Sequence, residues 1–409
     1  MSAIGSKIRN LRLRLGLSQR QLAGKEMTRA FISLVESGRA TPSQRTLRII
    51  AQRLGKPLEC FLAEERSTDG VDLGGMIFKE AQRKVQAGEI QPALQMLYQV
   101  FKETRNQYLR AAAHDLLSIC LTHLGRFAEA LSECKEALEI FRAVKDRTGI
   151  VQEYLRLGAL AFALEDFPEA RKAYEEAVQC TLGQKRLQDL HIEALTNLGA
   201  TLVYLGELQE AIRVYQDAVR ACSIQGDLPR LGRIATGLGM ALLHSDQVEA
   251  ALEWAQRAVD LLDKDQGPDK IHALHVIGRT LAARGDYDEA YRIYQVCFAA
   301  YKDKNLIGAQ ASLLEDLSWY WLQRGELPKA KRLCREALDL LDTQDDGILR
   351  GRLYRVLGII AREDGDTERA YFLLRMSYDL ARRLNASKEA VQSFEALQEL
   401  KAGRSPKFP

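Results

Sequence analysis

The stretch LGATLVYLGELQEA, residues 198–211, decides the fold of most of this 409-residue chain. It ends in the pattern Gly-acid-apolar-x-x-Ala, and the landmark alanine of that pattern recurs at intervals of 37 to 41 residues. The eight landmark alanines are Ala93, Ala130, Ala170, Ala211, Ala251, Ala290, Ala330 and Ala370. A period of this size is typical of repeats in which each unit is a pair of helices.

The positions around each landmark alanine repeat as well. A small residue stands twelve positions before it, another stands seven positions after it except at Val100, and a glycine or an acid stands five positions before it. Two closely packed antiparallel helices need small side chains where their backbones cross, and glycine suits the turn between them. One hairpin cannot bury its apolar face alone, so the hairpins stack. We therefore predict an all-α chain with a solenoid of about eight helical hairpins over residues 76–402, ended by a capping helix at Ser387–Lys401.

The repeat resembles the tetratricopeptide (TPR) family. The pairs Leu157-Gly158, Leu198-Gly199, Leu238-Gly239 and Leu357-Gly358 match the Leu-Gly of the first TPR helix. The chain departs from that family in its longer period, about 40 residues where 34 is usual, and in lacking the proline near the repeat end. The resemblance implies a right-handed, TPR-like α-solenoid, and the longer period implies longer second helices.

The first 64 residues show a different organisation, that of a domain of five short helices. Ser18-Gln-Arg-Gln21 has the form of a capping box, and Thr28 and Ser43 are predicted N-caps of the following helices. The fifth helix is predicted at 57–62. Residues 65–75, which contain three glycines among polar residues, are the predicted linker to the repeats.

Charge separates these two parts of the chain. The net charge is +3, yet residues 1–65 alone carry an excess of seven positive charges, so the remainder is mildly acidic. A basic domain on an acidic body favours a polyanionic partner for that domain. No signal peptide and no membrane-length apolar stretch is present, which predicts a cytoplasmic protein with no membrane contact. The seven cysteines are scattered, so we expect free thiols and neither disulfides nor a zinc site.

The runs 17–23, 28–39 and 42–51 resemble the Cro/repressor (XRE-type) helix-turn-helix family, and the resemblance covers residues 4–62. It implies that the helix Thr28–Glu36 enters the major groove of double-stranded DNA. The residues expected at DNA are Gln19, Thr28, Arg29, Ala30, Ser33, Leu34, Arg39, Ser43 and Arg45. Because one such domain reads only a short half-site, we expect a homodimer on a palindrome.

Individual roles follow from the side chains. Arg29 is the candidate for a bidentate contact to guanine, and Gln19 matches the phosphate-binding glutamine of the family. Leu34 either meets a thymine methyl group or is simply a tolerated exposed leucine. Glu36 is expected to bond within the domain, because a carboxylate gains nothing from facing phosphate.

The TPR resemblance also indicates which residues line the concave face of the repeats. The candidate ligand-binding residues are Asn197, Thr236, His275, Arg279, Trp319 and Arg355. This face is basic towards its C-terminal end and has an aromatic surface at Trp319, so it suits a peptide's carboxylate and an apolar side chain. It is equally compatible with a solvated charged face with internal ion pairs. His272 and His275 lack a nearby third ligand, so no metal is predicted.

A helix-turn-helix head on a long TPR body is similar to the peptide-sensing regulators of Gram-positive bacteria, the RRNPP family, whose members act in quorum sensing. The resemblance implies a transcriptional regulator whose repeats sense a short peptide. Those proteins commonly hold the peptide backbone with several groove asparagines, and here only Asn197 can be placed. The alternative is a TPR scaffold that docks a partner protein, such as a response regulator, with the head as its DNA tether. No phosphate loop, H-E-x-x-H or G-x-S-x-G motif is present, so neither an enzyme nor a cofactor is predicted.

Overall fold

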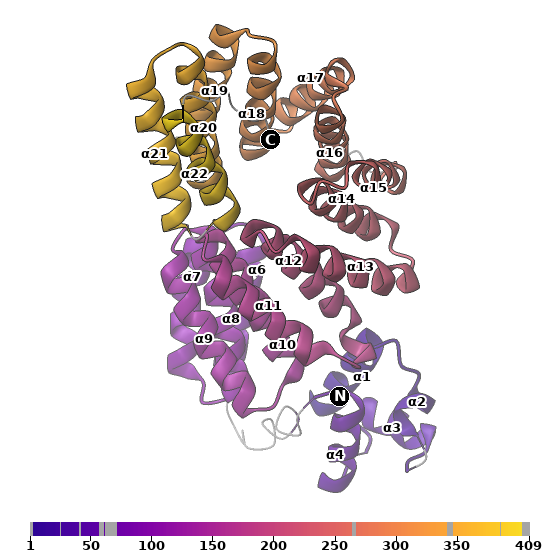
Figure 1. Cartoon of the computed structure of the whole chain (residues 1–409). Helices are drawn as coiled ribbons and strands as arrows, with labels where there is room; N and C mark the ends of the chain where they lie inside the picture. The colour runs from indigo at the N-terminus through magenta and orange to yellow at the C-terminus, as the bar shows by residue number, and fades with distance from the viewer. Residues whose placement is uncertain are drawn as a thin grey trace. The chain divides into compact units, whose positions relative to one another are not determined.

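The structure, a computed structural model, describes residues 3–24, 26–40, 42–56, 61, 72–263, 267–341, 347–384 and 386–402. Within these ranges every regular element is a helix (Figure 1), which confirms the prediction of an all-α chain. The chain divides into two compact units, Met1–Leu160 and Ala161–Pro409. None of the helices in the described ranges is long and apolar enough to cross a membrane.

The N-terminal head contains four described helices. They are α1 (Ala3–Arg14), α2 (Gln19–Ala23), α3 (Arg29–Glu36) and α4 (Gln44–Arg53). All three predicted N-caps are confirmed: Ser18 forms the capping box with Gln21, and Thr28 and Ser43 accept from the backbone of Phe31 and Thr46. Their side chains satisfy amide groups that the first turn of a helix leaves free. The core consists of Ile4, Ile8, Leu22, Ala23, Ile32, Val35, Leu47, Ile50, Ala51, Leu54 and Phe61.

The predicted fifth helix and linker fall largely outside the described residues. Phe61, within the predicted fifth helix, is helical and buried. The first repeat helix begins at Leu73, inside the stretch predicted as linker, and Asp72 caps it by accepting from the Gly75 amide at 3.0 Å.

Eight consecutive pairs of helices follow, and then one last helix, as the repeat predicts. Their bounds are α6 (Leu73–Gln86), α7 (Ile90–Glu103), α8 (Gln107–His123), α9 (Phe127–Ala143), α10 (Arg147–Ala163), α11 (Phe167–Thr181), α12 (Gln188–Leu205), α13 (Leu208–Gln225), α14 (Leu228–His244), α15 (Val248–Leu261), α16 (Pro268–Arg284), α17 (Tyr287–Asp303), α18 (Ile307–Gln323), α19 (Leu327–Leu341), α20 (Gly347–Glu363), α21 (Thr367–Arg383) and α22 (Ser387–Lys401). A short 3-10 helix, Lys185–Leu187, precedes α12.

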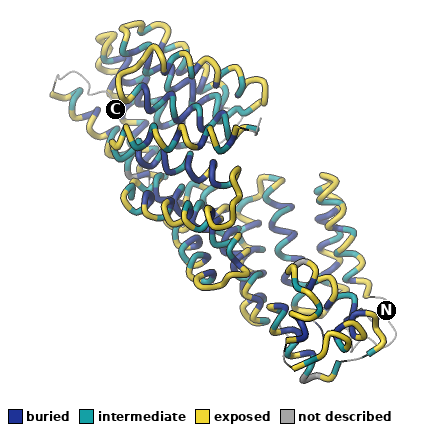
Figure 2. The backbone as a smooth tube through the Cα atoms, turned by 90° about the vertical axis from the view of Figure 1, so that its right-hand side faces the viewer, coloured by how far each residue is buried: buried dark blue, intermediate teal, exposed yellow. Residues whose placement is uncertain are grey.

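The landmark alanines lie where the helices cross. All eight are completely buried, and the small residues twelve positions before and seven positions after them are buried as well. A Cβ atom on Gly278 would lie 2.7 Å from the ring of Tyr294, so only glycine permits this approach. Figure 2 shows the consequence along the backbone, with buried residues on the faces that meet and exposed residues at the turns. The prediction of closely packed helical hairpins is therefore confirmed.

The residue five positions before each landmark alanine has a positive φ in every repeat. Six of these residues are glycines, and the other two are Glu165 (φ 58°) and Asp246 (φ 64°). An L-residue in this left-handed conformation costs about 1 kcal/mol or more. Two of the eight repeats therefore keep an acid where glycine would be easier to place.

Glu165 has a second role, at a contact between the two ends of the second unit. Its Oε1 accepts a hydrogen bond of 3.1 Å from the Ile348 amide in the first turn of α20. Around this bond, Phe167 and Ile348 are buried against Ala381 and Ala386. The beginning of this unit, up to α12, thus packs against its last helices, and the repeats of residues 161–402 close on themselves.

The cysteines agree with the prediction of free thiols. Six of them lie in the described ranges, and none of these six forms a disulfide; Cys180 is half-buried and the others are buried. Cys60 lies outside the described residues.

Candidate functional site

The outer face of α3 has the geometry predicted for a DNA-reading helix. Ile32, Val35 and Glu36 are buried, whereas the opposite face is exposed. The exposed residues are Thr28, Arg29, Ala30, Ser33 and Leu34. Leu34 is 43% exposed, which is common for a single surface leucine and leaves it accessible to a ligand. The helix thus presents one arginine, small side chains and one apolar side chain to solvent.

A buried carboxylate holds α3 in place. Glu36, which is 2% exposed, accepts hydrogen bonds from Arg12 Nε at 2.5 Å and Nη2 at 2.9 Å, and from Gln19 Nε2 at 2.9 Å. Arg12 Nη1 donates to the Leu17 carbonyl at 2.8 Å. One carboxylate therefore joins α1, α2 and α3, and every nitrogen of the guanidinium group has a partner. The prediction that Glu36 bonds within the domain is confirmed.

This network keeps both partners ionised. Burial alone would raise the pKa of Glu36, but the hydrogen bonds from Arg12 and Gln19 outweigh it, and the pKa is lowered. The hydrogen bond to Glu36 raises the pKa of Arg12 despite its burial. An ion pair with such geometry fixes the orientation of helices, because neither charge can leave without stranding the other.

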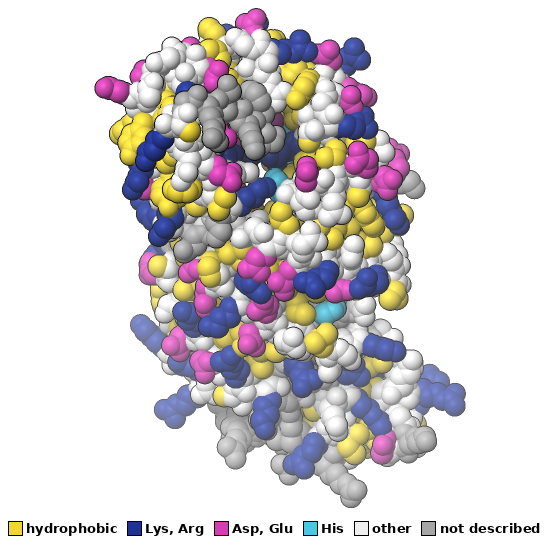
Figure 3. Space-filling model, in the orientation of Figure 1, with side chains coloured by type: hydrophobic (Ala, Val, Ile, Leu, Met, Phe, Trp, Pro, Cys, Tyr) yellow, Lys and Arg dark blue, Asp and Glu magenta, His cyan; other side chains and the backbone are white. Residues whose placement is uncertain are grey.

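The remaining predicted DNA-contact residues lie at helix starts and turns. Arg39 and Ser43 are exposed, and the Ser43 side chain caps α4. Gln19 is half-buried, because its amide is engaged by Glu36. Arg45 lies in the first turn of α4, and its side chain lies outside the description. In Figure 3 the head, at the bottom of the view, shows many Lys and Arg side chains and few acidic ones.

The head also contacts the first repeats, within the first unit. Lys56 Nζ, after α4, lies 2.9 Å from Asp146 Oδ2 at the start of α10 and 3.5 Å from the hydroxyl of Tyr108 on α8. Asp146 is almost fully buried. Burial would lower the pKa of Lys56, but Asp146 and Tyr108 outweigh it and the pKa is raised. The pair is therefore an ion pair at neutral pH.

The second unit contains a concave pocket with a cavity volume of about 950 Å³, lined mainly by α12, α14, α16, α18, α20 and α22, with two tyrosines of α17. Five of the six predicted ligand-binding residues line it, namely Thr236, His275, Arg279, Trp319 and Arg355. Asn197 is half-buried on α12 and lies outside the lining. The volume falls at the upper end of the range typical of ligand sites, about 300–1,000 Å³. Figure 3 shows Lys, Arg and His side chains at a hollow in this part of the repeats.

One side of the concave pocket is a satisfied polar network. His275 Nε2 lies 2.7 Å from Asp316 Oδ2, and Arg279 Nε lies 3.4 Å from the other carboxylate oxygen. Burial would raise the pKa of Asp316, but Arg279 and His275 outweigh it, and the pKa is lowered. Arg352 pairs with Glu315 on α18 at 3.0 Å. Asp316 was not among the predicted ligand-binding residues, although it lies on α18 together with the predicted Trp319.

The other side holds two cationic side chains, Arg355 and Lys388, beside the imidazole of His244. Lys388 Nζ donates to His244 Nδ1 at 2.7 Å, which joins α22 to α14. Burial, with repulsion from Arg279, Arg352 and Arg355, lowers the pKa of Lys388 to about 8 against the attraction of Glu389. Burial and the same cationic surroundings lower the pKa of His244, so this imidazole is neutral. Clustered pKa shifts of this kind are typical of binding sites.

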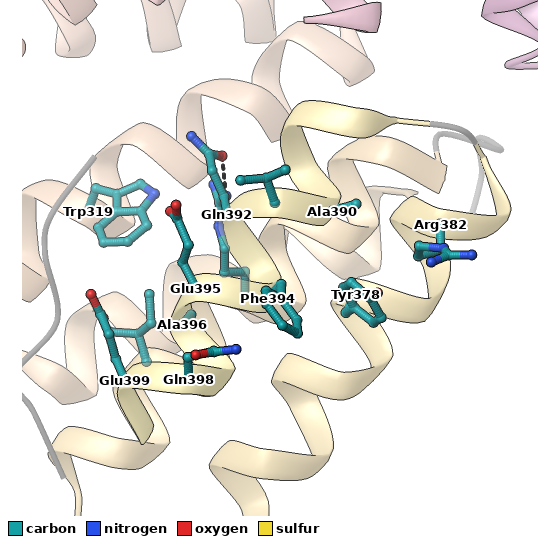
Figure 4. Close-up of a pocket in the computed structure, with 13 residues that line it drawn as sticks. Trp319, Tyr378, Arg382, Ala390, Gln392, Phe394, Glu395, Ala396, Gln398 and Glu399 are labelled. Carbon is teal, nitrogen blue, oxygen red and sulfur yellow. Dashed lines mark hydrogen bonds between the residues drawn. The ribbon is translucent and has the colours of Figure 1, made fainter. Parts of the chain in front are cut away.

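A second cavity of about 890 Å³, the terminal pocket, adjoins the first and shares Trp319, Arg355 and Gln392 with it. Figure 4 shows Phe394, Glu395 and Glu399 of α22 in its lining and Tyr378 of α21, with the hydrogen bond from Arg355 to Gln392 dashed. Burial lowers the pKa of Arg355, whose Nε has no partner among the described residues. Arg355 thus stands at the boundary of both cavities.

Comparison with known families identifies both parts of the chain. Residues 8–59 match the helix-turn-helix family, residues 108–182, 154–224 and 190–264 match the tetratricopeptide repeat, and residues 232–404 match the MalT-like TPR region. The chain is therefore a helix-turn-helix domain followed by TPR repeats, as the sequence predicted. These families are regulatory and binding modules and not enzymes. No curated protein matches the chain.

Several solved structures share the fold at low sequence identity. Apo RapI has a TM-score of 0.58 and 10% identity, over 67% of this chain and 98% of RapI. A Rap protein complexed with competence and sporulation factor has a TM-score of 0.53 and 13% identity, over 97% of this chain and 98% of its own. The Rap conjugation gene regulator of plasmid pLS20, in complex with the Phr* peptide, has a TM-score of 0.55 and 13% identity, over 95% and 97%. At these identities the likeness shows the fold alone: this chain shares the helical-repeat architecture of the Rap proteins.

Proposed function

We propose that this chain, with its helix-turn-helix head and TPR body, is a sequence-specific DNA-binding transcriptional regulator that senses a short peptide in the concave pocket. The observation that carries the proposal is the exposed face of α3, held by a buried and fully bonded carboxylate. Because Glu36 ties α3 to α1 and α2, the helix can hold its side chains in register with base edges, as direct readout requires. The predicted head of residues 1–64, linker 65–75 and repeats 76–402 are its proposed domains, with the first repeat helix beginning at Leu73 instead of after residue 75.

The division of labour on α3 follows from its side chains. Arg29 is assigned a bidentate contact to guanine, and Leu34 an apolar contact to a thymine methyl group. Gln19, Thr28, Arg39, Ser43 and Arg45 are assigned to phosphates, while Ala30 and Ser33 allow close approach to bases. A homodimer on a palindrome supplies the length of site that one head lacks.

The peptide is the ligand class that the concave pocket favours. The pocket combines an aromatic surface at Trp319 with cationic groups at Arg355 and Arg279, which suits one apolar side chain and one carboxylate. The pLS20 Rap regulator was solved with the Phr* peptide, which supports the same class here. Peptide sensing of this kind fits a cytoplasmic quorum-sensing role.

The DNA-binding role of the head is tested by incubating genomic fragments with the purified protein and sequencing those that it retains. We expect a palindrome that Arg29→Ala holds about 10–100-fold more weakly, from the loss of one bidentate contact of about 1–3 kcal/mol. Arg220→Ala is the matched control, because Arg220 is an exposed arginine on α13 that lies in the repeats. Equal retention by all three proteins, together with co-purification of a full-length partner, would favour the protein-docking alternative.

A further inference from the structure

Two cationic side chains line the concave pocket, the buried Arg355 and the half-buried Lys388. Arg355 is 7% exposed, and its Nε forms no hydrogen bond within the described ranges. Lys388 donates to the imidazole of His244, a neutral group. Neither cation forms an ion pair in the part of the chain that the structure describes. A buried charge without a counter-charge is costly, so such a group points to a function.

The nearby carboxylates do not fill this role. Glu315 is paired with Arg352, and Asp316 is shared by Arg279 and His275. Glu389 also lines the pocket and attracts both Lys388 and Arg355, but it pairs with neither. Glu395 attracts Arg355 as well, yet no ion pair joins Arg355 or Lys388 to a carboxylate among the described residues.

The two cations lie on helices that take part in the closure of the second unit. Lys388 stands in the first turn of α22 and reaches His244 on α14, while a Cβ on Gly206, at the end of α12, would lie 3.6 Å from the Lys388 Cβ. Arg355 stands on α20, the helix whose first turn bonds to Glu165. A group bound to both cations would therefore link α20 and α22 beside the contact with α14.

We propose that the effector carries a carboxylate at its terminus, that Arg355 and Lys388 bind this carboxylate together, and that its binding holds α22 in the closed arrangement. The inference rests on the proposed peptide-sensing function and specifies the chemistry of the ligand.

The physical reason is that one carboxylate satisfies both stranded cations at once. Arg355 Nε and Lys388 Nζ are both donors, and hydrogen bonds between ionised groups are about twice as strong as neutral ones. The same carboxylate cancels the repulsion that makes Lys388 easy to deprotonate. Trp319 lines the same pocket and offers an aromatic surface for an apolar side chain next to the terminus.

The experiment compares two pools of short synthetic peptides that lack Asp and Glu. The pools are identical except that one ends in a free carboxylate and the other in an amide. Peptides retained by the full chain are identified by mass spectrometry, for the wild type and for Arg355→Gln and Lys388→Gln. The control is Arg375→Gln, because Arg375 is an exposed arginine on α21.

We expect the wild type and the control to retain the carboxylate peptides at least tenfold better than the amides. Both Gln variants should lose this preference, and Arg355→Lys should recover part of it. Bound peptide should also slow hydrogen exchange in α22. The unfolding temperature of each variant is measured alongside, and Lys388→Gln should not unfold earlier, because it removes one of several neighbouring positive charges.

A second probe, inorganic phosphate at constant ionic strength, separates the inference from the proposed function. Peptides retained without regard to their terminus would overturn the inference and leave peptide sensing standing. If no peptide binds, but phosphate slows exchange in α22 of the wild type and not of the Gln variants, the anion site stands and the peptide effector falls. If neither probe distinguishes the wild type from the variants, the inference is wrong.

Discussion

The head and the concave pocket both bury charged side chains, but they treat them differently. In the head, Arg12 and Glu36 form a bidentate pair, and Gln19 and the Leu17 carbonyl take up the remaining hydrogen-bonding groups. In the pocket, Arg355 keeps an unpaired Nε and Lys388 faces a neutral imidazole. The difference indicates that the first cluster is part of the architecture, since nothing further can bind to it. The second leaves its charge available to a ligand.

The largest effect is expected where the satisfied pair is broken. Glu36→Gln leaves the Arg12 guanidinium buried without a counter-charge, which costs about 3–5 kcal/mol. Hydrogen–deuterium exchange of the full chain should therefore accelerate about 100-fold or more in peptides from α1–α3. Asp379→Asn, which breaks an exposed pair with Arg375, is the control and should change little. Unchanged exchange in the head would mean that the buried pair does not hold α3.

The next largest loss of stability is expected when the ion pair between the head and the first repeats is broken. Asp146→Asn removes the charge opposite Lys56 at an almost fully buried position, with an expected cost of about 1–3 kcal/mol. The pair raises the pKa of Lys56, so its stabilisation is present below the usual value for lysine and is lost as the pH rises through the folded-state pKa.

A double-mutant cycle with Lys56→Met measures this coupling. We expect Lys56→Met and Asp146→Asn together to cost less than the sum of the single variants, since the second change removes the stranded partner. The free energy of unfolding of each variant is measured by urea unfolding of the full chain. If the costs of the two single substitutions simply add, the two side chains do not support each other.

The repeat architecture could be predicted from the sequence because its signal is local. The landmark alanines and the positions five, seven and twelve residues away record the crossing of adjacent helices, and all of them have the predicted burial or turn conformation. The N-caps Ser18, Thr28 and Ser43 are local too, since each acts within three residues.

The closure could not be predicted in the same way. Glu165 and Ile348 are 183 residues apart, and His244 and Lys388 are 144 residues apart, so no 40-residue period relates them. The pocket lining was predicted for five residues from the position of each on its own repeat, but Lys388 stands on the capping helix, outside the repeat pattern. Asn197, predicted by the same rule, lies outside the lining because the pocket is formed mainly by the later repeats.

Removing the charge of Lys388 should raise the free energy of unfolding, whereas removing the charge of Glu36 should lower it. The pKa of Lys388 is about 8, below its usual 10.5, so the folded state releases this proton first. The penalty of the charged lysine is fully present below pH 8 and disappears as the pH rises from about 8 to 10.5. Lys388→Met should therefore stabilise the chain by of order 1–3 kcal/mol at pH 7 and by less at pH 9.5. Urea unfolding at both pH values tests the sign, and a variant less stable than the wild type at pH 7 contradicts it.

The smallest effects on stability are expected at Glu165 and Asp246, the two acids that replace glycine in the turns. These two residues differ in whether a hydrogen bond offsets their backbone strain. Glu165 and Asp246 have the same left-handed conformation, but the Glu165 carboxylate accepts from the Ile348 amide. Glu165→Gly should relieve about 1 kcal/mol of backbone strain and lose a hydrogen bond of similar worth, so the net change should be near zero. Asp246→Gly gives up no such bond to another helix among the described residues and should stabilise the chain by about 0.5–1 kcal/mol. Hydrogen exchange in α20 should accelerate in Glu165→Gly alone, because the bond to its first turn is lost. Equal responses of α20 to the two substitutions would mean that Glu165 is kept for a reason other than closure.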